Sequence, residues 1–144
     1  MNTTICGLCG HVAFEATPNN CPVCATSKER FKQSDRVFIE AEERNKEAAV
    51  NHVPVITVNK QCGLYLGQSC VDVFARIGRV LHPMKEEHRV AWIDCYIDRQ
   101  YVARCLLTTG VNPAAVFHLR KEGIKVCIVV LCNLHGYWQS EGYI

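Results

Sequence analysis

The sequence lacks the features that mark membrane-spanning, secreted and nucleic-acid-binding proteins. Its longest apolar run, Val126 to Cys132, is far shorter than the roughly 18 residues that a membrane helix needs. The N-terminus has neither a basic region nor an apolar stretch, so we expect no secretory signal and a cytoplasmic location. The net charge is only +2, without a polybasic run or an aromatic-interleaved basic stripe. We therefore expect neither a membrane nor nucleic acid as a partner.

Cysteine, by contrast, is abundant, at ten of 144 residues. In a reducing compartment so many thiols indicate metal ligands or buried free cysteines rather than a disulfide framework. The length allows one domain, or a small module beside a larger one.

The pattern along the chain changes twice. Four cysteines fall within the first 24 residues, and a segment rich in Glu, Ala, Arg and Lys, without Gly or Pro, follows from Phe38 to Val50. We expect a metal-nucleated module at residues 1–35, a helical linker at 36–50 and a main domain at 51–144. In the main domain, short runs of Val, Ile, Tyr and Cys between turn signals predict strands of an antiparallel sandwich. These strands are expected at 52–58, 71–80, 90–97, 101–108, 115–119 and 125–132.

Two Cys-x-x-Cys pairs, separated by eleven residues, dominate the N-terminal module. Four thiolates so placed can close a tetrahedral site around zinc or a single iron, and the residues alone leave both metals open. The four cysteines are Cys6, Cys9, Cys21 and Cys24. Because about 35 residues bury too little apolar surface to fold alone, we expect the metal to supply the missing free energy of folding. His11 would be a fifth ligand, so we expect it at the surface.

Five of the six histidines lie in the main domain, and four of them stand in distinctive patterns. The patterns are Asn51-His52-Val53-Pro54, His82-Pro83-Met84-Lys85-Glu86-Glu87-His88 and Cys132-Asn133-Leu134-His135-Gly136. Four imidazoles and one thiolate exceed what zinc sites use and suit redox-active iron or copper better. Loops from one end of a sandwich could bring these five side chains to one metal.

Both parts of the chain resemble known iron proteins. The run from Cys6-Gly-Leu-Cys9-Gly10 to Cys21-Pro-Val-Cys24-Ala25 is similar to the rubredoxin-like module of rubrerythrins, which implies a one-electron iron centre. The three histidine patterns resemble the superoxide reductases, a family that includes desulfoferrodoxin and neelaredoxin. The resemblance implies a mainly β fold: an immunoglobulin-like antiparallel β-sandwich, preceded here by a small rubredoxin-like metal module and a short linker helix.

The same resemblance implies a ligand set and a reaction. The equatorial iron ligands would be His52, His82, His88 and His135, with Cys132 as the axial ligand. Such a centre reduces superoxide by one electron to hydrogen peroxide, which detoxifies superoxide under oxidative stress. The net positive charge of Fe(II) with one thiolate would attract the superoxide anion, and the trans thiolate would donate electron density. Turnover needs an external electron, and the family suggests reduced rubredoxin or a rubredoxin reductase as the donor. The rubredoxin-like iron or zinc centre would act as a relay. The family also suggests a homodimer.

The chain departs from the family at the first histidine. Many superoxide reductases have a Glu-Lys pair there, whereas this sequence has Val50 and Asn51. An asparagine amide can donate a hydrogen bond but carries no charge, so we expect weaker attraction of superoxide and weaker protonation. Lys85 and Lys60 are the nearest cationic substitutes. We keep Asn51 and Lys85 as candidate catalytic residues beside the five ligands.

Two other functions stay open: a non-enzymatic iron electron-transfer protein, and an iron-based sensor of reactive oxygen species or nitric oxide. The remaining cysteines also have two interpretations. Cys62 and Cys70 could form a redox pair or bind metal, but together with Cys95, Cys105 and Cys127 we expect them to be reduced, buried thiols.

Overall fold

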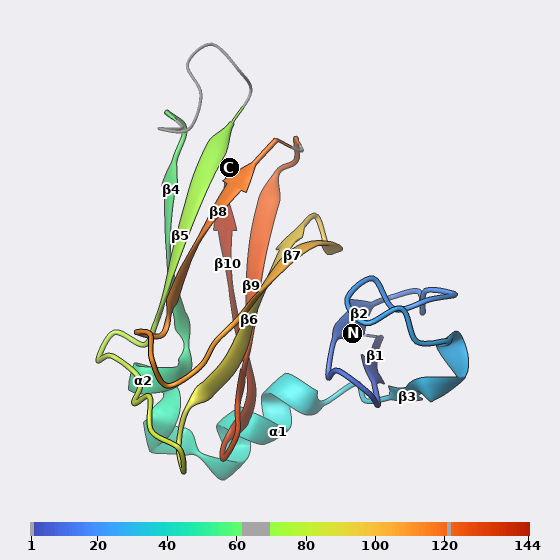
Figure 1. Ribbon diagram of the computed structural model, residues 1–144, viewed down its shortest axis with the longest axis horizontal. Helices are drawn as coiled ribbons and strands as arrows, with labels where there is room; N and C mark the ends of the chain where they lie inside the picture. The colour runs from blue at the N-terminus through green and yellow to red at the C-terminus, as the bar shows by residue number, and fades with distance from the viewer. Residues whose placement is uncertain (1, 62–69, 121) are drawn as a thin grey trace. The chain divides into compact units, whose positions relative to one another are not determined.

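The computed structural model describes residues 2–61, 70–120 and 122–144. Its internal contacts divide the chain into two compact units, Met1–Val37 and Phe38–Ile144 (Figure 1). The predicted linker therefore begins at the boundary and continues into the second unit. No helix in the described residues combines the length and the apolar character needed to span a bilayer.

The first unit is built on a three-stranded antiparallel sheet of order β2-β1-β3. Its strands are β1 (Thr3–Cys6), β2 (Val12–Phe14) and β3 (Phe31–Gln33), and a short 3-10 helix, η1, covers Lys28–Arg30. All three residues of β2 are buried, but the unit has few other buried apolar side chains. So small a core supports the expectation that a metal contributes to its folding.

The second unit is a sandwich in which two antiparallel sheets pack against each other (Figure 1). One sheet has the order β10-β9-β6-β7 and the other β4-β5-β8. Their strands are β4 (Pro54–Asn59), β5 (Val71–Ile77), β6 (Val90–Ile97), β7 (Gln100–Leu106), β8 (Ala114–Leu119), β9 (Lys125–Cys132) and β10 (Gly136–Tyr143). In β5 and β8 buried residues alternate with exposed ones, as expected for strands with one face on the core and one in solvent.

The central strands β6 and β9 are buried on both faces, which explains their near-continuous apolar sequence. On the face of β6 away from the core, the fully buried Asp94 carboxylate accepts two hydrogen bonds from Arg104 of β7, at 2.6 and 2.9 Å. The Arg104 guanidinium also lies 3.9 Å from the ring centre of Trp92. A buried charge in the sheet is thus neutralised by a partner held in place by an aromatic ring.

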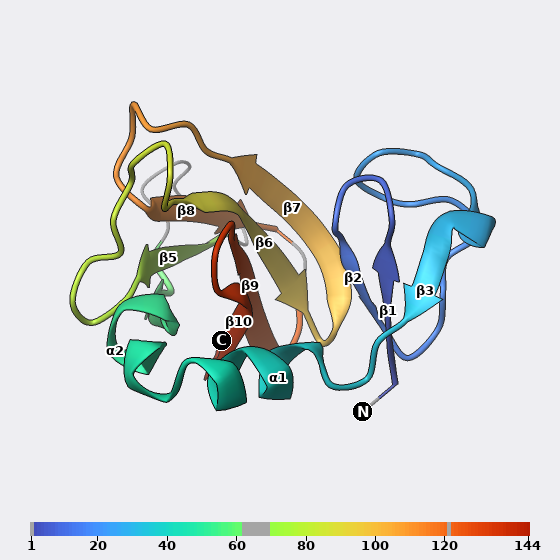
Figure 2. The same ribbon diagram turned by 90° about the horizontal axis from the view of Figure 1, so that it is seen from below.

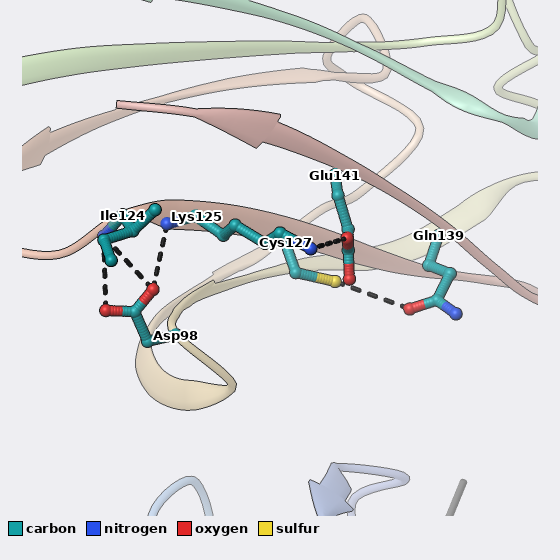
Figure 3. A network of polar contacts seen from close by, with 6 residues as sticks. All are labelled: Asp98, Ile124, Lys125, Cys127, Gln139 and Glu141. Carbon is teal, nitrogen blue, oxygen red and sulfur yellow. Dashed lines mark hydrogen bonds and ion pairs between the residues drawn. The ribbon is translucent and has the colours of Figure 1, made fainter.

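The hairpin turn between β6 and β7 is tied to the start of β9. Asp98 and Arg99 both adopt left-handed backbone conformations, as in the tight turns that match the twist of hairpin strands. The Asp98 carboxylate accepts hydrogen bonds from the backbone N–H groups of Ile124 and Lys125 (Figure 3). Further along the same pair of strands, Lys125 forms a surface ion pair with Glu141, and the Cys127 thiol donates to Gln139.

The linker is helical but not one continuous helix. It consists of α1 (Val37–Arg44), the 3-10 helix η2 (Lys46–Ala48) and the single turn α2 (Ala49–His52). The break falls at Asn45, whose backbone leaves the helical region. Figure 2 views the sandwich from the end where α2 lies.

The strand predictions differ from the structure in three places. The strand predicted at 71–80 ends at Ile77, where the chain turns. His52, assigned to the first strand, ends α2, and the strand begins at Pro54. The last strand, β10, was not predicted at all.

Candidate metal centres

The five candidate ligands of the main domain all lie at one end of the sandwich. His52 is the last residue of α2, His82 and His88 lie in the connection from β5 to β6, and Cys132 ends β9. His135 lies in the turn between β9 and β10. These segments meet at the lower end of the second unit in Figure 1. Chain segments separated by up to 83 residues therefore converge on one place.

Four ring nitrogens of these histidines form an array that we call the histidine square: His52, His82, His88 and His135. The Nε2 atom of His52 lies 3.2 Å from Nε2 of His82 and 3.2 Å from Nδ1 of His135. Nδ1 of His135 is in turn 3.2 Å from Nε2 of His88. The centre of a square with such edges is about 2.3 Å from each corner, close to a metal–imidazole bond. Three histidines thus present Nε2 to the centre, and His135 presents Nδ1.

Hydrogen bonds behind the square fix which nitrogens carry protons. Nδ1–H of His52 donates to the carbonyl oxygen of Ala48 at 2.8 Å, and Nδ1–H of His82 donates to that of Pro83 at 2.6 Å. Their Nε2 atoms then carry no proton, so two lone pairs face each other across 3.2 Å. Burial lowers the pKa of both imidazoles to about 4, which keeps them neutral at physiological pH. A cation between the lone pairs relieves their repulsion, so this array fits a bound metal ion.

Cys132 supplies a sulfur next to the square. Its Sγ is 3.8 Å from Nδ1 of His135, and it lies within 4.8 Å of the ligand atoms of His52, His88 and His135. Burial raises the pKa of the thiol, while backbone N–H groups of His135 and Leu134 donate to the sulfur and oppose that rise. A metal cation would favour the thiolate further, and a set of four imidazoles with one thiolate suits redox-active iron or copper.

Three further residues support the site. Asn133 joins two ligand loops: its Oδ1 accepts from the N–H of Arg89 at 2.8 Å, and its Nδ2 donates to the carbonyl of Glu87 at 3.2 Å. Trp138 lies with its ring centre 5.0 Å from that of His52, and its Nε1–H donates to the carbonyl of His135. Gly78 has positive φ and lies so close to the backbone of Asn51 that a Cβ would clash.

The two candidate catalytic residues outside the ligand set lie on different loops. The Asn51 side chain contacts the outer side of His52, where Oδ1 is 2.7 Å from Nδ1. Lys85 is exposed, and its backbone exchanges hydrogen bonds with that of His88 at 3.0 and 3.1 Å. Burial is the main cause of the lowered pKa of His88, and the charge of Lys85 adds to the effect. Asn51 therefore contacts a ligand from behind, and Lys85 places its positive charge near the square.

In the first unit, the two Cys-x-x-Cys pairs face each other. The sulfur atoms of Cys6 and Cys24 are 3.6 Å apart, as are those of Cys9 and Cys21, and all four lie within 4.8 Å of one another. A tetrahedral metal with bonds of 2.3 Å to sulfur requires about 3.8 Å between its ligands, so the array fits zinc or iron alike.

Both pairs end in the same turn. In each, the residue after the second cysteine has positive φ and donates its N–H to the carbonyl of the first, Gly10 to Cys6 and Ala25 to Cys21. Alanine at such a position is disfavoured relative to glycine. The prediction that His11 is a surface residue was wrong: it is 2% exposed, and its carbonyl accepts from the N–H of Cys6.

The other cysteines agree only in part with the expectation of buried free thiols. Cys95, Cys105 and Cys127 are free, and Cys95 and Cys127 are buried, as predicted. Cys105 is only half-buried. Cys70 is also half-buried, and it is held in a disulfide, so the expectation of a reduced, buried thiol was wrong there. Cys62 lies outside the described residues.

Comparisons with known proteins agree with this geometry. The desulfoferrodoxin homolog of Archaeoglobus fulgidus is 35% identical over 94 residues, which are 65% of this chain and 65% of that protein. The chain thus spans just under two thirds of that relative's length. The superoxide reductase of Pyrococcus abyssi is 34% identical over 102 residues, or 62% of this chain and 84% of that protein.

A solved structure and a family model extend these similarities. The crystal structure of the superoxide reductase from Treponema pallidum has a TM-score of 0.62 at 20% identity, with 97% of this chain and 98% of that chain covered. This likeness confirms the fold: an immunoglobulin-like sandwich with a small N-terminal module. The histidine–cysteine site and the four-cysteine cluster both fit an iron protein of this kind. Because the family model for desulfoferrodoxin matches residues 40–141, the chain belongs to the desulfoferrodoxin family.

Proposed function

We propose that this protein is a superoxide reductase, which reduces superoxide by one electron to hydrogen peroxide. The observation that carries the proposal is the histidine square with the Cys132 sulfur beside it. Hydrogen bonds to Nδ1 of His52 and His82 keep the Nε2 atoms of these two ligands free of protons. A metal held by these five side chains would keep a position for a small anion such as superoxide. Iron bound there would supply the electron and recover it from a donor.

The protein groups around the site have separate roles in this proposal. The four imidazoles and Cys132 hold the metal, and the N–H groups of Leu134 and His135 tune the electron donation of the sulfur. Lys85 attracts superoxide, since an exposed cation next to a ligand raises the local concentration of a small anion. Asn51 orients His52 through the hydrogen bond to Nδ1.

We infer a relay role for the first unit, with residues 1–35 as a rubredoxin-like domain and 51–144 as the catalytic domain. The four-cysteine site would pass electrons from reduced rubredoxin or a rubredoxin reductase, and the protein would act in the cytoplasm as a homodimer. Replacing the metal of this site by zinc tests the relay, because zinc cannot change its oxidation state. Steady-state turnover should fall while the single reaction with superoxide stays unchanged; equal turnover would rule the relay out.

The proposed activity is tested by rapid mixing of the fully reduced protein with a pulse of superoxide, followed through the absorption of the iron–thiolate centre. We expect oxidation close to the diffusion limit, and its loss in Cys132→Ser. Lys85→Met should slow the reaction several-fold and flatten its dependence on salt, whereas Lys125→Met, at the other end of β9, should not.

Slow or absent oxidation in protein with full iron occupancy would overturn the proposal. Reversible oxidation without a selective reaction with superoxide would then favour an electron carrier. Slow release of a bound small ligand would favour a sensor.

A further inference from the structure

Another group of potential metal ligands lies in the second unit, away from the histidine square. Cys70 immediately precedes β5, and Asp72 follows two residues later, so the alternation of a strand places both on one face. His118 on β8 is the direct cross-strand partner of Asp72. The Cys70 sulfur, a carboxylate oxygen of Asp72 and a ring nitrogen of His118 all lie within 4.8 Å of one another.

The position of this cluster separates it from the histidine square. β5 runs from Val71 to Ile77, and the square lies beyond the end at Ile77 (Figure 1). At about 3.3 Å per strand residue, the two sites are roughly 20 Å apart. The cluster therefore cannot share a metal with the square.

The chemistry of the cluster is that of a three-ligand zinc site. Thiolate, imidazole and carboxylate all bind zinc at about 2.0–2.3 Å, and a tetrahedral ion needs about 3.3–3.8 Å between ligand atoms. Nδ1 of His118 is now 2.7 Å from Oδ1 of Asp72, a hydrogen bond that would have to lengthen by less than 1 Å or so to admit the ion. Because His118 is exposed and the other two residues are half-buried, water can fill the fourth position.

The sulfur is the ligand that decides whether the site can bind. Cys70 is held in a disulfide, and a disulfide sulfur is a poor ligand compared with a thiolate. Without it, Asp72 and His118 offer only two ligands on an exposed surface, too few for tight binding.

We propose that Cys70, Asp72 and His118 form a thiol-gated site for a divalent cation of the zinc class. A dithiol reductant opens the gate: the S–S bond breaks, two electrons and two protons pass to the two cysteine sulfurs, and the reductant becomes a disulfide. The cation then displaces the proton of Cys70 and bridges the thiolate, the carboxylate and the imidazole. A small-molecule disulfide reverses the step by thiol–disulfide exchange: the protein S–S bond re-forms, the oxidant leaves as two thiols, and the cation is released.

Binding of Co²⁺ to the full-length, iron-loaded protein tests the proposal, because Co²⁺ takes the tetrahedral sites of zinc and gives an intense absorption with a thiolate ligand. The disulfide is first reduced anaerobically with a water-soluble phosphine, which is then removed. In this reaction the phosphine takes the oxygen atom of a water molecule and becomes a phosphine oxide, and the two cysteine sulfurs take the two hydrogens of that water. We expect the reduced protein to bind one Co²⁺ per chain more than the oxidised protein, with the thiolate absorption. The bands of the resident iron centres show in each sample that the protein is folded and that its iron is retained.

Three variants assign the ligands. Cys70→Ser should show no Co²⁺–thiolate absorption, whether or not the protein was first reduced. His118→Gln should weaken Co²⁺ binding at least tenfold. Cys105→Ser, which removes a half-buried free thiol outside the cluster, should bind as the wild type does. The proposal is overturned if the reduced wild type binds no additional Co²⁺, if the oxidised protein binds it equally well, or if the absorption survives in Cys70→Ser. Superoxide is absent from this assay, so its result is independent of the proposed enzymatic function.

Discussion

Replacing Asn133 should loosen the iron site without touching a ligand. The Asn133 side chain joins the loop of His88 to the turn between Cys132 and His135 through two hydrogen bonds, from Arg89 N–H at 2.8 Å and to the Glu87 carbonyl at 3.2 Å. Each such bond contributes about 0.5–1.5 kcal/mol, and exposure to solvent places this pair at the low end, about 1–2 kcal/mol together. Asn133→Ala should therefore release iron about five to thirty times faster, within the range known for groups that orient metal ligands.

The assay follows the iron–thiolate absorption after addition of a strong chelator at neutral pH. Asn133→Asp keeps the acceptor for Arg89 but loses the donor to Glu87, so its release rate should fall between those of the wild type and Asn133→Ala. Asn59→Ala is the matched control, since the Asn59 side chain makes a local bond to Gln61 N–H at the distant end of β4. Release at the wild-type rate in Asn133→Ala would refute the bridging role.

Three further predictions concern stability and reactivity. Arg104→Met removes both hydrogen bonds that Arg104 donates to the fully buried Asp94 carboxylate and should lower the free energy of unfolding by about 3–5 kcal/mol in urea denaturation. Lys125→Met at the exposed ion pair should cost at most about 1 kcal/mol. Burial raises the pKa of the Cys95 and Cys127 thiols to about 12. At pH 8 neither thiol should therefore react with iodoacetamide in the folded protein, whereas both should react in denaturant. Rapid labelling of these two thiols in the native protein would contradict this prediction. In metal-free protein, two imidazoles of the histidine square have pKa values lowered to about 4, so the unfolded chain takes up more protons below about pH 6.5. Thermal stability should therefore fall between pH 6.5 and 4, and a flat profile would show that these imidazoles are not buried and neutral.

The strands that could be predicted from the sequence are those with a clear apolar pattern. β5 and β8 alternate, and β6 and β9 are continuous apolar runs, so the bounds of β6 and β9 were predicted correctly. β10 has the sequence Gly-Tyr-Trp-Gln-Ser-Glu-Gly-Tyr, in which two glycines and three polar residues hide the strand. It lies at the edge of its sheet, where pairing with β9 along its whole length outweighs its weak intrinsic preference.

The geometry of the site was harder to predict than its composition. The motifs named the five candidate ligands, but His52 was assigned to a strand because the valines and isoleucine after it form one. The single turn α2 is too short to be stable alone; contacts such as that of the His52 ring with the Ala48 carbonyl stabilise it. Asn133 could not be recognised either, since its partners lie more than 40 residues earlier in the chain.

Val50 and Asn51 stand where many superoxide reductases have a Glu-Lys pair. We interpret this difference as the separation of two roles, the orientation of a histidine ligand and the attraction of an anion. An amide on the outer side of His52 can orient that ligand, because Oδ1 is an acceptor for Nδ1–H, but it cannot attract an anion. The charge must then come from another segment, and Lys85 lies in the connection that carries His82 and His88. Because its backbone is paired with His88 on both sides, the position of that cation is coupled to a metal ligand. Under the proposed function, loss of the usual lysine would change the source of the attraction for superoxide and would leave the metal ligands themselves intact.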